Sequence, residues 1–188
     1  MFIEPSQKFS TLVSPRITVM QGAVEVTDED GVMLTTVLGS CIAACLYDPV
    51  AKVGGMNHFL LAEPEHREGQ PATFDEHFGL YLMELLVNRM MQAGAIKSRM
   101  RAHIYGGANI HKAMRAIGSV NAAFAERFLN AEAIMLSHRD VGGDCARRVD
   151  FLAAQGKARC RHVVQSAAPP PTPVRSSRPE SVGDVEFF

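Results

Sequence analysis

The stretch that decides the fold reads LGSCIAACLYDPVAKVGGMNHFLL, residues 38–61. Two apolar runs typical of strands, Cys41 to Tyr47 and Val53 to Leu61, flank Asp48-Pro49-Val50-Ala51. Proline at the second position of a β-turn already has the φ that the turn needs, so the stretch predicts a hairpin. With Pro49 and Val50 at the centre of the turn, Cys41 lies directly opposite His58, and their Cβ atoms are about 5 Å apart.

Cys41 and His58 in that arrangement form a candidate catalytic pair. A thiol attacks as the thiolate, and a neighbouring imidazole favours this form. The Gly39-Ser40-Cys41 turn also offers backbone N–H groups to a developing oxyanion, so the pattern indicates acyl transfer through a thioester. The residue types alone leave a second interpretation open, in which Cys41 is a small core residue and His58 a satisfied buried polar group.

Hydrophobic periodicity predicts further strands and helices along the chain. The expected strands are Ile17–Met20, Ala23–Val26, Met33–Leu38, Ala102–Tyr105, Ala133–Leu136, Val149–Leu152 and Ala158–Val164. The capping-box pattern Thr73-Phe74-Asp75-Glu76 starts the clearest helix, which ends at Gly94. A short helix is expected over Ile110–Ile117, and Ser119 is expected to cap another. This mixture indicates an α/β or α+β fold.

Composition divides the 188 residues into one domain with two extensions. The domain spans residues 17–165 and follows a loosely ordered extension over residues 1–16. Residues 166–188 start with an extended, proline-rich linker and end in the acidic-aromatic peptide GDVEFF, residues 183–188. That peptide is expected to be a docking motif for a partner, or else a terminal segment without consequence.

Charge, hydropathy and cysteine usage exclude several classes of protein. A net charge of −1 argues against nucleic acid as the main partner. Apolar runs of about seven residues are too short to cross a membrane, and no export signal is apparent. A free nucleophilic thiol fits the reducing cytoplasm, where we expect the protein to act. Cys41 and Cys45 are about 13 Å apart in a strand, too far for a disulfide, and Cys145 and Cys160 lack metal-ligand spacing.

Six blocks of residues in a defined order carry a resemblance to a known family. The blocks are TTVLGSC (35–41), LYDP (46–49), GGMNHFL (54–60), AHIYGGA (102–108), IGSVN (117–121) and DVGGDCAR (140–147). Together they resemble the signature of the chemoreceptor glutamine deamidase family, CheD, over most of the chain. His103 departs from the pattern, since lysine is expected there, and this change concerns a surface contact rather than the chemistry.

The resemblance implies a fold, a reaction and roles for three residues. The fold is expected to be a single layered α/β sandwich with mixed β-sheets and flanking helices. Cys41 is expected to attack the carboxamide carbon of a receptor glutamine, and His58 to move the proton. Thr35, six residues before the cysteine, is expected to orient the imidazole. The glutamine becomes glutamate and ammonia leaves, with no metal or organic cofactor implied.

Four small residues are expected to shape the site around the nucleophile. Gly39 and Ser40 precede Cys41 directly, and Gly106 and Gly107 end the fourth block. Glycine lets backbone approach closely, so these residues are expected to position the substrate or its oxyanion. Tight turns without a functional role are the alternative for the Gly-Gly pairs.

The resemblance also implies partners. These are the cytoplasmic helices of chemoreceptors and a CheC-type phosphatase of the chemotaxis pathway. A regulatory module that docks to either partner without catalysis is an alternative, which the intact Thr35, Cys41 and His58 argue against. A general thiol amidase or protease is another alternative, and cleavage of a peptide backbone would identify it.

Overall fold

The computed structural model describes residues 15–61, 76–110 and 117–163. The strands are β1 (Arg16–Thr18), β2 (Val24–Thr27), β3 (Met33–Leu38), β4 (Ile42–Asp48), β5 (Val53–Asn57), β6 (Arg101–Gly106), β7 (Met135–Val141), β8 (Ala146–Leu152) and β9 (Lys157–Val163). The helices are α1 (His77–Gln92) and α2 (Ile117–Ala131), with short 3₁₀ turns η1 (Lys97–Arg99) and η2 (Ala153–Gln155).

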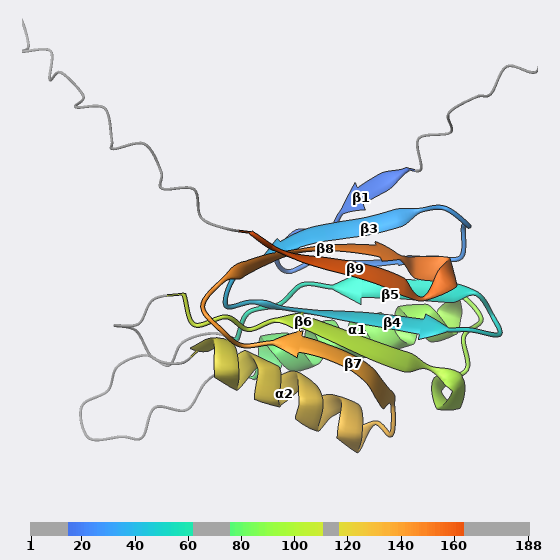
Figure 1. The fold of residues 1–188 in the computed structure, drawn as a ribbon. Helices are drawn as coiled ribbons and strands as arrows, with labels where there is room; N and C mark the ends of the chain where they lie inside the picture. Colours follow the sequence, from blue (N-terminus) through green and yellow to red (C-terminus); the bar gives the residue numbers. More distant parts are fainter. Residues whose placement is uncertain (1–14, 62–75, 111–116, 164–188) are drawn as a thin grey trace, which may run out of the picture.

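These elements form three layers (Figure 1). A four-stranded sheet in the order β1-β3-β8-β9 packs on a five-stranded sheet in the order β2-β5-β4-β6-β7. Both sheets are mixed, because β1 runs parallel to β3 and β6 runs parallel to β7. The two helices cover the far face of the five-stranded sheet. The predicted layered α/β sandwich with mixed sheets and flanking helices is confirmed.

Strand β4 lies in the middle of this stack and is buried on both faces. Ile42, Ala44 and Leu46 pack toward the helices, whereas Ala43 and Cys45 pack into the layer between the two sheets. Burial on both faces explains why the strand is a continuous apolar run without polar alternation.

The predicted hairpin forms from β4 and β5, but its turn is longer than expected. Asp48 pairs with Val53, which leaves a four-residue loop over residues 49–52 in place of a two-residue turn. The buried Asp48 carboxylate holds this loop, since Oδ1 accepts hydrogen bonds from the amides of Val50 and Ala51. Its other oxygen accepts a bond from Arg99 at 2.7 Å.

The longer loop shifts the register by two residues. Ile42 bridges Phe59, so the residue opposite Cys41 is Leu60 and His58 lies diagonal to Cys41. The prediction that Cys41 and His58 are directly opposite is therefore wrong. Because side chains alternate with a period of two, the same shift keeps both residues on the inter-sheet face.

Three other predicted elements differ from the structure. Ser119 lies inside α2, which starts at Ile117, and its hydroxyl accepts a bond from Asn109. Strand β7 continues through His138 to Val141, because its parallel pairing with β6 extends that far. Arg16, expected in the loosely ordered extension, starts β1 instead. The capping-box residues 73–75, residues 111–116 of the expected short helix, residues 1–14 and the tail over residues 166–188 lie outside the described residues.

Candidate active site

Cys41 occupies the link between β3 and β4, where the chain passes from one sheet to the other. Two hydrogen bonds fix this link to the loop after β6. The amide of Gly107 donates to the carbonyl of Cys41 at 2.8 Å, and the amide of Ala108 donates to the carbonyl of Gly39 at 2.9 Å. The backbone around the thiol is therefore held from outside its own strand.

Glycine is required at residues 106 and 107 because their backbone lies so close to the backbone of Cys41 and Gly118. A Cβ added to Gly106 would lie 2.1 Å from the carbonyl oxygen of Cys41, and its φ of +108° strains other residues. Gly107 also has a positive φ, and an added Cβ would lie 2.7 Å from the Gly118 carbonyl. The expected close approach is present at both residues. Gly107 positions the turn and is not a free oxyanion donor, since its amide is bonded to Cys41.

Asn121 of α2 holds the other side of the Gly39-Ser40-Cys41 turn. Its side-chain amide donates to the Ser40 carbonyl at 2.8 Å, and its oxygen accepts the Leu61 amide at 3.0 Å. Asn121 is fully buried, so both bonds are shielded from water. Asn121 belongs to the IGSVN block, and no pattern in the sequence signals this role.

His58 is buried and has a defined hydrogen-bond arrangement on one ring nitrogen. The Thr36 hydroxyl donates its single proton to the Val19 carbonyl at 2.8 Å. Nδ1 of His58 lies 2.9 Å from that hydroxyl oxygen and 3.3 Å from the same carbonyl. Both neighbours therefore act as acceptors, and we assign the imidazole proton to Nδ1.

The other ring nitrogen of His58 is left as an acceptor. Nε2 is buried and has no hydrogen-bond partner among the described residues. Its lone pair is thus available to take a proton from a thiol or a water molecule. Burial lowers the pKa of His58 although the Val19 carbonyl opposes this, so the imidazole is neutral near pH 7.

Cys41 is half-buried, and no hydrogen bond joins its Sγ to His58 in the described structure. A diagonal pair in a sheet has its residues about 7–8 Å apart, beyond a directly opposite pair. Burial raises the pKa of the Cys41 thiol, and only the Cys41 amide opposes this shift. The resting pair is therefore a neutral thiol and a neutral imidazole, and catalytic contacts often tighten only when substrate binds.

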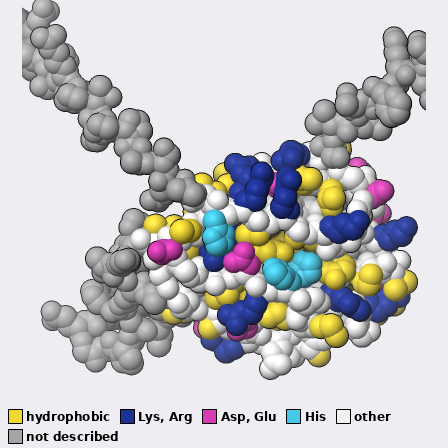
Figure 2. Space-filling view, viewed as in Figure 1, with side chains coloured by type: hydrophobic (Ala, Val, Ile, Leu, Met, Phe, Trp, Pro, Cys, Tyr) yellow, Lys and Arg dark blue, Asp and Glu magenta, His cyan; other side chains and the backbone are white. Residues whose placement is uncertain are grey.

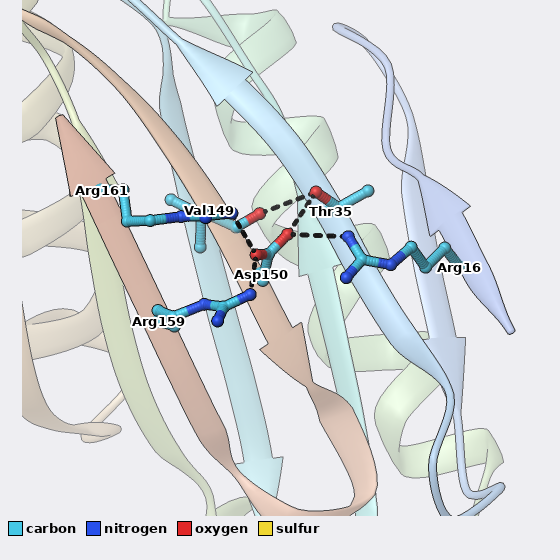
Figure 3. A network of polar contacts seen from close by, with 6 residues as sticks. All are labelled: Arg16, Thr35, Val149, Asp150, Arg159 and Arg161. Atoms are coloured by element: carbon cyan, nitrogen blue, oxygen red, sulfur yellow. Dashed lines mark hydrogen bonds and ion pairs between the residues drawn. The ribbon is translucent and has the colours of Figure 1, made fainter. Parts of the chain in front are cut away.

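Thr36, and not Thr35, contacts the imidazole. Adjacent residues of a strand point to opposite faces, so only one of the two threonines faces the layer between the sheets. The Thr35 hydroxyl donates instead to Asp150 at 2.9 Å, with the Val149 carbonyl at 3.1 Å (Figure 3). These bonds contradict the expectation that Thr35 orients His58.

One feature of the site escaped the sequence analysis. Gln21 lies against Cys41, with Oε1 accepting from Cys41 Sγ at 3.5 Å, and no pattern in the sequence signals it. Among the described residues, no main-chain carbonyl accepts the backbone amide of Ser40 or Cys41. The oxyanion role expected for this turn stays a prediction.

Metal and membrane features are absent from residues 15–61, 76–110 and 117–163. No group of three or more His, Cys, Asp or Glu side chains in these ranges is placed to hold a metal ion. Neither described α-helix is long and apolar enough to cross a membrane.

Comparisons with known proteins give one consistent result. The family model described as "CheD chemotactic sensory transduction" matches residues 60–162. A protein of Zymomonas mobilis subsp. mobilis is 50% identical over 185 residues, which cover 98% of this chain and 99% of the relative. Proteins of Caulobacter vibrioides and Agrobacterium fabrum are 43% and 39% identical, each over 92% of this chain and over 93% and 96% of their own length. All three relatives are named "Probable chemoreceptor glutamine deamidase CheD".

A solved structure from Neisseria meningitidis is also similar, with a TM-score of 0.43 and 11% identity. It covers 69% of this chain and 63% of its own. This likeness is too distant to support an argument.

Proposed function

This chain belongs to the CheD family, and we propose that it hydrolyses glutamine side chains of chemoreceptors with Cys41 as the nucleophile. The relatives are named for glutamine deamidation, which supports a hydrolase acting on carboxamides. The observation that carries the assignment of residues is the unpaired, buried Nε2 of His58 on the same inter-sheet face as Cys41.

In the first half of the reaction, His58 acts as the general base. The Cys41 thiol gives its proton to Nε2, and the sulfur forms a bond to the carboxamide carbon of the glutamine. The Ser40 and Cys41 amides stabilise the oxyanion, and such a donor is typically worth about 3 kcal/mol. The imidazolium then returns the proton to the departing nitrogen, the C–N bond breaks, and ammonia leaves a thioester on Cys41.

In the second half, water replaces the sulfur. Nε2 of His58 takes a proton from a water molecule, whose oxygen attacks the thioester carbon. The C–S bond breaks, the proton passes to the Cys41 sulfur, and a glutamate side chain is released. During both halves Nδ1 keeps its proton in the hydrogen bond to Thr36, so the ring gains and loses protons only at Nε2.

The test uses the purified full chain and a receptor cytoplasmic fragment. Mass spectrometry of peptides would show glutamine converted to glutamate by the wild type and not by Cys41→Ala. New peptide fragments instead of converted glutamines would identify a protease. Absence of conversion with binding intact in both proteins would leave only the docking module.

Three finer expectations belong to the same proposal. The protein is expected to act in the cytoplasm, to bind a CheC-type phosphatase, and to use the tail over residues 166–188 for docking. Comparing receptor and phosphatase affinities of the full chain and of a chain ending at residue 165 checks the last of these. Unchanged affinities would contradict it.

A further inference from the structure

The outer face of the four-stranded sheet carries a concentration of positive charge. Both described α-helices pack on the other sheet, so neither covers this face (Figure 1). On β8 and β9 the charged residues that point outward are Arg148, Asp150, Lys157, Arg159 and Arg161, because Val149 and Phe151 point into the core. Figure 2 shows Lys and Arg side chains gathered on the upper side of the molecule, over this sheet.

One buried carboxylate organises three of the arginines. Asp150 has a side chain only 2% exposed, and its oxygens lie 2.9 Å from Arg159, 3.1 Å from Arg161 and 3.6 Å from Arg16 (Figure 3). Burial raises the pKa of Asp150, but hydrogen bonds from Arg159 and Thr35 and the charge of Arg16 outweigh this and lower it. The carboxylate therefore stays ionised and fixes the guanidinium groups in place.

The same arginines retain most of their hydrogen-bonding capacity. Arg16, Arg159 and Arg161 have side chains 49%, 58% and 54% exposed. A guanidinium has five N–H donors, and a single carboxylate cannot satisfy three such groups. One negative charge beneath these three cations, with exposed Arg148 and Lys157 beside them, leaves the face strongly positive.

This cationic face reaches toward the nucleophile. Arg148 lies between Val37 on β3 and Arg161 on β9 in the sheet. Val37 is 46% exposed and precedes Cys41 by four residues, so their Cα atoms are at most about 14 Å apart. A helix of a few turns, at about 5.4 Å a turn, spans this separation.

We propose that this cationic face binds an acidic stretch of a receptor signalling helix while Cys41 acts on a glutamine elsewhere on the same helix. The proposal rests on the function proposed above. Arg159 and Arg161 are two residues apart on one strand, about 7 Å, which is close to the spacing of carboxylates one turn apart on a helix. The reaction itself places carboxylates on that helix, since each converted glutamine becomes a glutamate.

Nucleic acid fits this face less well than an acidic protein helix does. The whole chain has a net charge of −1, so the positive charge is local and the rest of the molecule repels a long polyanion. Planar guanidinium groups held in fixed positions match carboxylates two donors at a time.

The test compares two exposed strand arginines that undergo the same change of charge. Arg148→Glu is the test variant, because it alters the cationic face without removing a partner of Asp150. Arg101→Glu is the control, because Arg101 is exposed at the start of β6 in the other sheet. We expect Arg148→Glu to raise KM for a receptor fragment roughly 5- to 30-fold, with a smaller change in kcat, and to weaken its salt dependence. The double variant Arg159→Gln/Arg161→Gln should act in the same direction, with Arg16 still paired to Asp150. Arg101→Glu should leave KM within about 2-fold of the wild type.

Equal effects of Arg148→Glu and Arg101→Glu would overturn the proposal. Fragment affinity is also measured in a Cys41→Ala background, which separates docking from chemistry. If Arg148→Glu lost affinity for the fragment but the wild type deamidated nothing, the docking face would be supported and the proposed reaction refuted. If removing residues 166–188 tightened binding only when Arg148 is present, the acidic end of this chain would be the occupant and the proposal would fail.

Discussion

Replacing Thr36 by valine tests which threonine serves the imidazole. The change removes the hydroxyl that lies 2.9 Å from His58 Nδ1 and keeps a side chain of similar shape. In the transition state of the proposed reaction the His58 ring is an imidazolium, and a hydrogen bond to a charged group contributes about 1.5–3 kcal/mol. The Val19 carbonyl, 3.3 Å from Nδ1, remains as a second acceptor, so we expect the lower part of this range.

A loss of about 2 kcal/mol corresponds to roughly a 30-fold fall in kcat. The assay is the rate of glutamine conversion in a receptor fragment at saturation, with the midpoint of urea unfolding measured alongside. Thr36→Ser keeps the hydroxyl and should recover most of the activity. The acid limb of the rate profile should also move for Thr36→Val and not for the serine variant.

Thr35→Val is the matched control, because it changes the neighbouring residue on the opposite face of β3. Asp150 loses one donor but keeps its arginines, so we expect a destabilisation of about 1–2 kcal/mol and a kcat within 2-fold of the wild type. The opposite result would refute the reasoning: a large fall in kcat for Thr35→Val at native stability, with Thr36→Val unimpaired.

Three further predictions follow from the same contacts. Because burial raises the pKa of Cys41, its alkylation by iodoacetamide in the free protein should increase with pH up to and beyond the ordinary range of a thiol, and a plateau at neutral pH would contradict a neutral resting pair. Asn121→Leu should lower the free energy of unfolding by about 2–4 kcal/mol and reduce kcat, since two buried backbone groups lose their partner. Asn121→Asp can still accept from Leu61 but cannot donate to Ser40, so its stability and kcat should both stay below those of the wild type. Burial raises the pKa of Asp48, but Arg99 and three backbone amides outweigh this and hold the pKa well below the usual range. The contribution of Asp48 to the free energy of unfolding is therefore complete above about pH 4 and declines as the pH falls further. Asp48→Asn should flatten this part of the curve of stability against pH.

The sequence predicts the strands of the active-site hairpin but not their register. Strand identity follows from local apolar runs, which are visible over a few residues. Register depends here on Asp48, whose carboxylate binds Arg99, 51 residues later, and thereby selects a four-residue loop. A proline turn is a local signal, whereas this ion pair exists only after the chain has folded.

The role of Thr36 could have been predicted from the strand itself. Leu34 and Leu38 of β3 face the core between the sheets, and a residue halfway between them must face the same way. Thr35 has the opposite parity. A position counted back from the cysteine ignores this alternation, which explains why the resemblance favoured the wrong neighbour for contact with His58.

The neutral resting pair has a consequence for selectivity. Burial disfavours both a thiolate at Cys41 and an imidazolium at His58, so the charged pair is unstable in the free protein. In the proposed reaction the charged pair forms only when a carboxamide is bound. The oxyanion that develops on this carboxamide then accepts hydrogen bonds from the Ser40 and Cys41 amides. In the proposed reaction, we therefore expect Cys41 to react slowly with small electrophiles and rapidly with a positioned glutamine. Recognition by the rest of the substrate then decides the rate, which is why a charged docking surface close to Cys41 would matter for choosing among receptor glutamines.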